Sequence, residues 1–425
     1  MKPKVSIIHR DEIPESPANY TKKSLKIVDG MIREALEKIG GIKAFVEPGD
    51  KVVIKPNLVW PVTADMAITT DPRVVACVVR LVKEEAGASE VVVADRTAVG
   101  RHTKDAFEES GIGAVAKRAG ADRVLSLEDD ERVLVQIPNC KSMLDGVHLP
   151  KTLLDADKII YLPKMKTHKM AVVSLTIKMN QGVLMWSEMI SCHRADLEQK
   201  MIDMLKVMRP NLAIVDGIWA QQGQGPGSPY QRDVMKDRNL IIAGSDPVAV
   251  DSVTSATMGF DPMIEVGLVS GAHCEGLGEG RLEHIEVLGE KISDVKRFFR
   301  RGTASLLGLH PKVEAYTGGA CMGCLGFART GIDVVLADPD FDWDPIEKIS
   351  IVIGYNTNVP ENLVHDPPRR YVFVIGDCTA DHKDKGVYFP GCASLAMHEM
   401  CEWWGKSDQG ILDVFWNYQP TGTRP

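Results

Sequence analysis

Four cysteines in the last quarter of the chain have the spacing of metal ligands. Cys321 and Cys324 form a C-x-x-C pair. Cys378 follows a short apolar run, and Cys392 ends a Pro-Gly-Cys triplet. Thiolates on glycine-containing turns suit a soft metal, because small residues let the backbone wrap around the ion or cluster. A zinc ribbon needs two close pairs, and a thioredoxin-type dithiol would leave Cys378 and Cys392 unexplained, so the spacing favours one four-iron four-sulfur (4Fe-4S) cluster.

The remaining cysteines predict no disulfide framework. The total of nine is odd, and no secretion signal precedes the first apolar run, so reduced thiols are expected. Cys77 lies inside an apolar stretch, and Cys401 lies nine residues beyond Cys392 on an expected helix. Both are interpreted as buried, small apolar side chains.

Polar side chains follow each of five short apolar runs. In an open parallel sheet the ligand crevice lies beyond the carboxyl ends of the strands, so these side chains meet at one edge if the strands are parallel. Lysine does not cap helix starts, and several ammonium groups at one crevice would hold a carboxylate or a phosphate. We therefore expect a site for a small anionic substrate. The residues after the successive runs are Lys55 and Asn57, then Asp95 and Arg96, then Lys164, Lys166 and His168, then Asp216, and finally Asp246.

Some of these residues have a simpler interpretation. Asp71 and Asp246 each precede a proline, and this pair of residues is typical of a helix start, so capping is favoured for both over catalysis. The glycine-rich segment 223–227, with Gly225 at its centre, would let backbone N–H groups approach an anion, but a flexible turn explains it equally well. His193 is either a general acid or base or a surface histidine before a helix.

Alternating strand and helix patterns predict the elements that position these residues. Short β-branched runs separated by amphipathic segments indicate an α/β fold with a mostly parallel sheet covered by helices. We assign residues 1–310 to this domain, which is long enough to hold two lobes. Residues 311–425 differ in texture, being rich in Gly, Cys, Asp and Pro, and are predicted to form a smaller cysteine-bearing α/β domain. Strands are expected at 52–54, 91–94, 158–162, 212–215, 240–243, 349–353 and 371–375, and helices at 22–39, 72–85, 104–118 and 196–207.

The composition argues against a nucleic-acid-binding protein and against a membrane-spanning protein. The 58 acidic residues exceed the 50 basic ones, and no long basic run is present, so nucleic acid is not expected as a partner. No stretch approaches the roughly 20 consecutive apolar residues of a membrane span. We therefore expect a cytoplasmic protein that is not attached to a membrane; the sequence does not indicate the oligomeric state.

Five segments together resemble one family, the domain-of-unknown-function family three-six-two, often labelled iron-sulfur-centre proteins. The resemblance implies a cluster and adds Lys178, Asn180 and Asp251 to the substrate-binding candidates. It also draws attention to the residues already selected from strand ends, although the family has no assigned reaction. The five segments are residues 53–59 (VIKPNLV), 162–168 (LPKMKTH), 175–182 (LTIKMNQG), 214–218 (IVDGI) with 223–226 (GQGP), and 244–251 (GSDPVAVD).

A second resemblance concerns the cysteines. Residues 376–378 (GDC) and 388–392 (YFPGC) look like the cluster-binding pattern of hydrogenase and quinone-reductase small subunits. In those subunits a Gly-x-Cys and a Pro-Gly-Cys supply two ligands of a four-iron cluster. Two prolines follow there, whereas this chain has Ala393 and Ser394.

These observations predict an iron-sulfur oxidoreductase that passes electrons to a small anionic substrate or cofactor. A redox partner protein is one possible source of the electrons, and the sequence does not identify the donor. The expected catalytic residues of the oxidoreductase are Lys55, Lys164, His168, His193 and Asp216; its substrate-binding residues are Asn57, Lys166, Lys178, Asn180, Gly225, Asp246 and Asp251; and its cluster ligands are the four cysteines. Two alternatives remain open. One is a racemase or lyase with a structural or Lewis-acid cluster, a class suggested by a more distant likeness to the amino-terminal domain of nickel-pincer lactate racemase. The other is a non-catalytic electron carrier. A flavin or nucleotide is neither indicated nor excluded, because no dinucleotide fingerprint is present.

Overall fold

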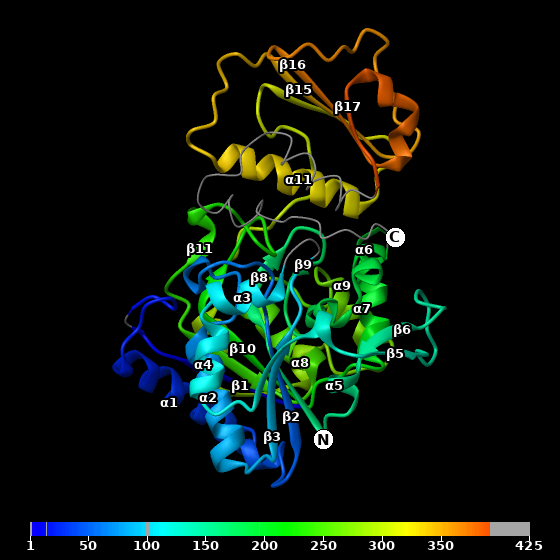
Figure 1. Cartoon of the computed structure of the whole chain (residues 1–425). Helices are drawn as coiled ribbons and strands as arrows, with labels where there is room; N and C mark the ends of the chain where they lie inside the picture. The colour runs from blue at the N-terminus through cyan, green and yellow to red at the C-terminus, as the bar shows by residue number, and fades with distance from the viewer. Residues whose placement is uncertain (1, 14, 99–101, 195, 392–425) are drawn as a thin grey trace. The chain divides into compact units, whose positions relative to one another are not determined.

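The computed structural model describes residues 2–391 except for residues 14, 99–101 and 195 (Figure 1). The chain forms two compact units. The first comprises Met1–Met189 and Asp196–Gly302, and the second comprises Ile190–Ala195 and Thr303–Pro425. Cys392 and Cys401 lie outside the described residues.

The first unit is built on a mixed sheet that is mostly parallel, as the sequence predicts. Its central strands β10, β7, β2, β3 and β4 are parallel neighbours in that order. Most of their buried apolar residues are Val, Ile, Leu and Ala, which is the composition of a strand covered on each side. The strands of this sheet path, in spatial order, are β13 (Glu286–Gly289), β1 (Lys4–His9), β12 (Leu240–Gly244), β10 (Leu212–Gln221), β7 (Lys158–Leu162), β2 (Lys51–Pro56), β3 (Glu90–Asp95) and β4 (Arg123–Ser126).

Strand β12 runs against its neighbours, and this changes one prediction. It pairs antiparallel with both β10 and β1. Its last residue, Gly244, lies opposite Ala213 near the start of β10. Asp246 therefore lies at the amino edge of the parallel strands, opposite the edge where the other strand-end residues gather. The expectation that Asp246 joins them is wrong, because it required a parallel β12.

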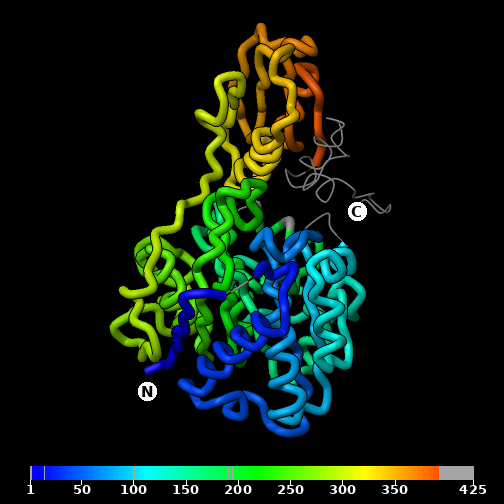
Figure 2. The backbone as a smooth tube through the Cα atoms, turned by 90° about the vertical axis from the view of Figure 1, so that its left-hand side faces the viewer, coloured from blue at the N-terminus to red at the C-terminus, as the bar shows by residue number. Residues whose placement is uncertain are grey.

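Helices cover both faces of this sheet (Figures 1 and 2). On one face α1, α2 and α4 pack over alternate strand residues, so Ile241 and Ala243 of β12 belong to that core whereas Ile242 points away from it. The α7, α8 and α9 helices lie on the other side of the sheet in Figure 1. The helices of this unit are α1 (Lys22–Lys38), α2 (Pro72–Arg80), α3 (Thr103–Glu109), α4 (Ile112–Arg118), α5 (Lys151–Leu154), α7 (Leu197–Leu205), α8 (Pro247–Thr257), α9 (Gly267–Cys274) and α10 (Ile292–Val295), while α6 (Trp186–Arg194) continues from it into the second unit.

Short elements complete the carboxyl edge of the sheet. Strand β8 (Lys164–His168) lies beside the second half of β10 and pairs with β9 (Val172–Val173). A 3-10 segment, η5 (Ile177–Val183), follows, and β11 (Val234–Met235) pairs with the end of β10. A separate hairpin joins β5 (Arg132–Val135) to β6 (Val147–Pro150).

The second unit has a parallel sheet of its own. The strands follow one another in chain order, β14, β15, β16 and β17, and every pair is parallel. The long helix α11 connects the first two strands, and a 3-10 segment, η8, connects the last two. The prediction of a smaller cysteine-bearing α/β domain is confirmed. Its elements are β14 (Val313–Tyr316), α11 (Met322–Ala337), β15 (Lys348–Ile353), β16 (Arg370–Ile375), η8 (Asp377–Lys385) and β17 (Val387–Phe389).

Within the described part of the chain, no helix has the length and apolar character needed to cross a membrane.

The glycine-rich loop after β10 packs directly onto β8. The backbone N–H of Lys169 donates to the carbonyl of Gly225 (3.0 Å), and the Thr167 hydroxyl donates to the carbonyl of Gly223 (2.9 Å). A Cβ atom at Gly225 would lie 1.8 Å from the carbonyl oxygen of Thr167. Gly225 is therefore required for the close approach of two backbones.

This contact gives a testable stability prediction. Gly225→Ala should lower the free energy of unfolding by about 3 kcal/mol, because the new methyl group must push β8 and the loop apart. Gly30→Ala is the matched control: Gly30 lies inside α1 with nothing within 4 Å of the added Cβ, so alanine there should raise stability by about 1 kcal/mol. Urea unfolding of both variants measures the difference, and equal effects would contradict the assignment.

Candidate functional site

The core of the site is β8, and a proline determines where that strand begins. Pro163 separates β7 from β8, and its carbonyl accepts the backbone N–H of Asp216 (2.8 Å). The chain then continues alongside β10, with Lys164 opposite Asp216 and Lys166 opposite Gln221 across a bulge. Side chains two residues apart in a strand lie on the same face, so Lys164 and Lys166 point to one side. Both lysines are fully buried.

Lys164 is neutralised by Asp216. The Nζ atom lies 2.9 Å from Oδ2 of the carboxylate, and neither side chain is exposed. The same carboxylate accepts the backbone N–H groups of Asp71 (2.7 Å) and Ile218 (3.1 Å). Burial raises the pKa of Asp216, although Lys164 opposes the shift. Asp216 lies within β10 and not after it, because the strand continues to Gln221.

A second buried ion pair, between Asp71 and Arg73, is linked to the Lys164–Asp216 pair. As the sequence predicts, Asp71 caps α2, accepting the N–H of Arg73 (2.8 Å). It also forms a fully buried ion pair with the Arg73 guanidinium (2.6 Å). Through its backbone N–H, Asp71 links this ion pair to the carboxylate of Asp216.

Lys55 has its own carboxylate partner, from the next strand. Its Nζ atom lies 2.5 Å from Oδ1 of Asp95, and each side chain is 1% exposed. The other oxygen of Asp95 accepts the N–H of Leu58 (2.7 Å). Lys55 also lies over the ring of Tyr161 (5.6 Å to the centroid), whose hydroxyl donates to Oδ1 of Asn180 (2.8 Å). Burial raises the pKa of Asp95, with Lys55 opposing the shift.

Lys166 differs from these two lysines. Its Nζ atom donates to the carbonyl of Ile68 (2.7 Å), and no carboxylate of the described residues lies within ion-pair distance of it. Burial lowers the pKa of Lys166 well below its usual value, and the nearby charges of Lys164 and Lys178 lower it further. Asp95 opposes these effects, but it is already paired with Lys55.

The η5 segment brings Lys178 and Asn180 to the same region, and Asp251 holds it in place. Asp251, on α8, accepts the backbone N–H groups of Thr176 (2.7 Å) and Ile177 (2.9 Å) at the start of η5. Burial raises its pKa to about 7. Both carboxyl oxygens of Asp251 therefore accept backbone hydrogen bonds that hold the start of η5. In the described structure, the Nδ2 atom of Asn180 is buried without a hydrogen-bond partner.

The structure places the remaining candidates as follows. His168 is buried at the end of β8, and its Nδ1 accepts the N–H groups of Met170 (3.1 Å) and Ala171 (3.2 Å), so in the neutral ring Nε2 carries the proton. Asn57 is half-buried, and its Oδ1 atom has no hydrogen-bond partner among the described residues. Asp246 caps α8 at the opposite sheet edge, as the Asp-Pro pattern predicts. His193 belongs to the second unit, where it makes an edge contact with the ring of Phe327.

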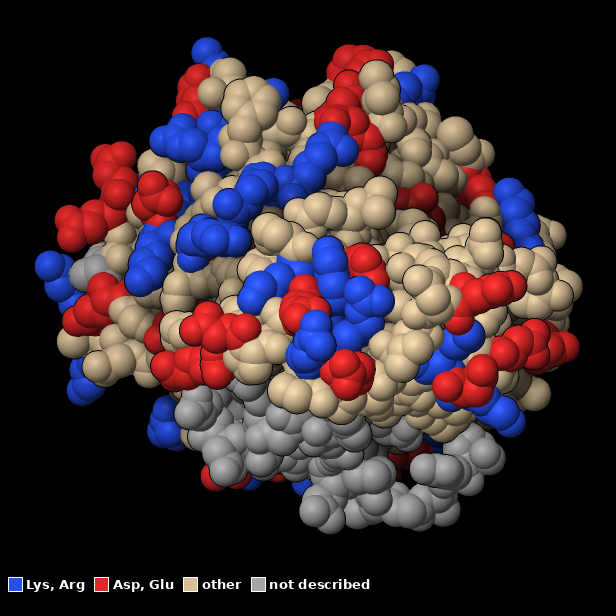
Figure 3. Space-filling model, turned by 90° about the horizontal axis from the view of Figure 1, so that it is seen from above, with Lys and Arg blue, Asp and Glu red and all other residues tan. Residues whose placement is uncertain are grey.

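The lysines are not part of the charged surface. Figure 3 shows Lys and Arg interspersed with Asp and Glu on one face of the molecule. Lys55, Lys164 and Lys166 are at most 1% exposed, and Lys178 is 6% exposed. Asp95 is not among the predicted catalytic or substrate-binding residues, although it follows an apolar run in the sequence. Its pairing with Lys55 depends on β2 and β3 being neighbours, which the sequence does not reveal. No feature of the sequence predicts that the Ile68 carbonyl accepts a hydrogen bond from Lys166.

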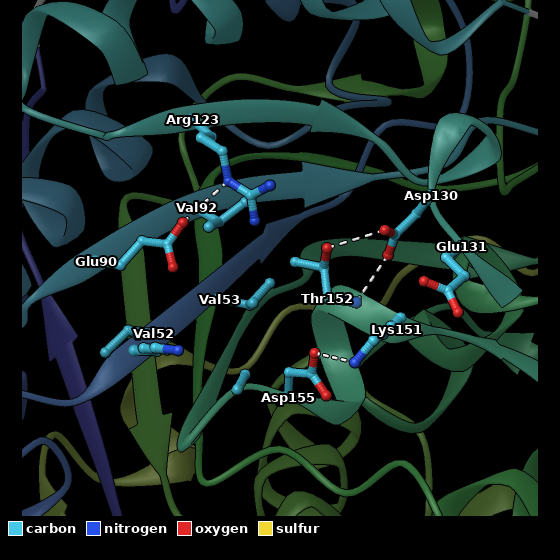
Figure 4. A pocket seen from close by; sticks show the side chains of 12 residues that line it. Val52, Val53, Glu90, Val92, Arg123, Asp130, Glu131, Lys151, Thr152 and Asp155 are labelled. Carbon is cyan, nitrogen blue, oxygen red and sulfur yellow. Dashed lines mark hydrogen bonds and ion pairs between the residues drawn. The ribbon is translucent and has the colours of Figure 1, made fainter. Parts of the chain in front are cut away.

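A pocket of about 230 Å³ lies elsewhere, at the amino ends of β2 and β3 (Figure 4). Two ion pairs lie among its lining residues: Arg123 contacts Glu90 (3.0 Å) and Lys151 contacts Asp155 (2.5 Å). This pocket is at the amino edge of the parallel strands, whereas Lys55, Lys164 and Lys166 lie at the carboxyl edge.

The described cysteines of the predicted cluster lie at the carboxyl edge of the second sheet. Cys321 caps α11, and its sulfur accepts the N–H of Cys324 (3.4 Å). Hydrogen bonds from the Cys324 thiol and from backbone N–H groups lower the pKa of Cys321 to about 6. Cys378 follows β16 and is exposed. Among the described residues, no three His, Cys, Asp or Glu side chains are close enough together to hold one metal ion.

Asp377 joins two cysteine-bearing segments. Its backbone N–H donates to the carbonyl of Gly391 (3.0 Å), and its Oδ1 accepts the N–H of Gly391 (2.8 Å). Gly391 precedes Cys392 in the sequence, as Asp377 precedes Cys378. The two Gly-containing turns of the hydrogenase-like pattern are therefore tied together by described residues.

The match to a family model agrees with the resemblance seen in the sequence. The family described as Domain of unknown function (DUF362) matches residues 52–256. A thylakoid-associated protein of Synechocystis sp., sll1697, is 30% identical over 242 residues, which are 54% of this chain and 70% of the relative. The lactate racemase apoprotein from Thermoanaerobacterium thermosaccharolyticum aligns over 85% of each chain, with 11% identity and a TM-score of 0.39.

The raised pKa of Asp251 predicts a pH dependence of stability. The folded chain holds this proton up to about pH 7, whereas an unfolded aspartate, with its model value of 3.8, releases it earlier. Stability should therefore fall as the pH rises through this window. Relative to Asp251→Asn, the wild type should lose about 3 kcal/mol between pH 5 and pH 8.

Urea unfolding of both proteins at the two pH values tests this prediction. Asp155→Asn, at a side chain that is 56% exposed, is the control. This variant retains Asp251, so its stability should follow that of the wild type at both pH values. A difference between wild type and Asp251→Asn that does not change with pH would contradict it.

Proposed function

The chain belongs to the DUF362 family, and from the geometry of its own residues we propose that it is an iron-sulfur oxidoreductase acting on a small anionic substrate. The first unit would bind the substrate at the carboxyl edge of its sheet. The second unit would hold one 4Fe-4S cluster that receives electrons from a redox partner protein. The family description names no reaction, so the proposal depends on the residues of the two units.

The observation that carries the substrate proposal is the excess of buried donors around Lys166. Lys164 and Lys55 each have a carboxylate partner, but Lys166 has none among the described residues, and Lys178 adds another cation nearby. Asn180 adds a buried N–H donor without a protein acceptor in the described structure. A buried lysine without a counter-charge and a buried N–H group without an acceptor are both costly, and a bound carboxylate or phosphate would satisfy both.

Two side chains at this edge suit proton handling and positioning. His168 has a fixed ring, because two backbone N–H groups bind Nδ1, and its Nε2 can donate a proton. Asp251 positions Lys178 and Asn180 through the start of η5. His193 lies in the second unit, and its predicted role in proton handling stays a prediction.

Cys321, Cys324, Cys378 and Cys392 would hold the cluster. The described residues fit a thiolate set in two respects: one pair lies at a helix start with backbone N–H groups directed at sulfur, and the Asp377–Gly391 hydrogen bonds join the segments of the other pair. A cluster bound there would supply one-electron transfer. The cytoplasmic location expected from the sequence stays a prediction; the Synechocystis relative is named as thylakoid-associated.

The cluster proposal is tested by replacing one ligand. After purification without oxygen, the wild type should contain about four irons and four sulfides per chain and give a spin-resonance signal on reduction. Cys378→Ser should lose most of the iron and the signal. Cys274→Ser, at another exposed cysteine outside the four, should retain both. Zinc without sulfide in the wild type, or full iron and sulfide in Cys378→Ser, would contradict the proposal.

The anion site is tested separately by thermal unfolding with inorganic phosphate, oxalate and 2-oxobutanoate. At least one of these anions should raise the melting temperature of the wild type by several degrees, in line with binding to the folded state only. Lys178→Met should abolish the increase, because it removes one cation from the site. Lys104→Met, at a side chain that is 75% exposed, should leave the increase unchanged. Equal responses in both variants would contradict the site.

A further inference from the structure

We propose that the Lys166 amine is a nucleophile that forms an imine with the carbonyl carbon of an oxo acid. This inference rests on the proposed anion site and specifies its substrate class. Lys166 and Lys178 would then have different tasks: the Lys166 amine bonds to the substrate, and the Lys178 ammonium group holds its carboxylate.

The contrast between the three lysines of β2 and β8 supports this division. Lys55 and Lys164 each contact a buried carboxylate, at 2.5 and 2.9 Å, so their ammonium charges are balanced. Lys166 is equally buried, but its only recorded hydrogen bond in the described structure goes to the neutral carbonyl of Ile68. A buried ammonium group without a counter-charge is strongly disfavoured, whereas a neutral amine donating to one carbonyl is not.

The surrounding charges act in the same direction. Lys164 and Lys178 are close enough to Lys166 to disfavour a third positive charge. A lysine that is desolvated and next to other cations loses its proton more readily than an exposed lysine, and the deprotonated amine is the nucleophilic form.

The reaction balances without another reagent. The Nζ lone pair attacks the carbonyl carbon, the carbonyl oxygen leaves as water with the two Nζ protons, and a C=N bond replaces the C=O bond. No electrons are gained or lost in this step. To reach the amine, the substrate must displace the Ile68 carbonyl, so the segment between β2 and α2 has to open.

The geometry also limits the substrate. Imine formation requires an aldehyde or a ketone, and the nearby cation of Lys178 favours a carboxylate beside it. A 2-oxo acid has both groups on adjacent carbons. Protonation of the imine nitrogen would make the bonded carbon more electron-poor than in the free carbonyl compound, which assists its reduction.

Reductive trapping tests the proposal on the full chain. The anaerobically purified protein is incubated with 2-oxobutanoate and sodium cyanoborohydride, and adducts are located by peptide mass spectrometry. We expect one dominant adduct, on Lys166. Lys166→Arg should reduce trapping at least tenfold, whereas Lys104→Arg should not change it. In the wild type, excess oxalate should protect Lys166, a measurement that does not depend on the folding of a variant.

The outcomes separate this inference from the proposed function. Stabilisation by 2-oxobutanoate without an adduct on Lys166 would overturn the imine and leave the anion site standing. Neither stabilisation nor adduct would overturn both. Trapping spread over exposed lysines and unaffected by Lys166→Arg or by oxalate would also overturn the inference.

Discussion

The burial of lysine amines is the constraint on which the rest of the amino-terminal unit depends. Removing an ammonium group from water costs several kcal/mol unless a counter-charge and hydrogen bonds replace the lost hydration. Here the counter-charges come from neighbouring strands, with Lys55 on β2 facing Asp95 on β3 and Lys164 on β8 facing Asp216 on β10. The same carboxylates accept N–H groups of the segment after β2, so charge balance also fixes the loop.

Much of this arrangement could be predicted from strand ends. Lys55, Lys164 and Lys166 gather as expected, because β2, β7 and β10 are parallel and their carboxyl ends share one edge. Asp246 lies at the opposite edge, because β12 is antiparallel to β10. The sequence could not predict this, since an apolar run has the same pattern in a parallel and in an antiparallel strand. The sequence equally gave no sign that β10 continues past Asp216, since Gly217 interrupts the apolar pattern while the backbone pairing persists.

The other features of the two sites depend on contacts between segments that are distant in the sequence, and these could not be predicted. Nothing near Lys166 in the sequence distinguishes it from Lys164; the difference arises because Asp216 faces one lysine and the Ile68 carbonyl meets the other. Asp251 came from family resemblance alone, and its structural role became evident only when α8 was seen to meet the start of η5. In the second unit the C-x-x-C spacing was visible, whereas the Asp377–Gly391 connection required the fold.

The proline break before β8 also makes the site sensitive to chain length. Successive side chains of a strand alternate between faces, so a one-residue insertion between Pro163 and Lys164 would turn both lysines away and present Met165 and Thr167 instead. Asp216 would then lie buried without its partner. Relatives that retain this chemistry should accordingly tolerate substitutions in β8 more readily than changes in the number of residues before it.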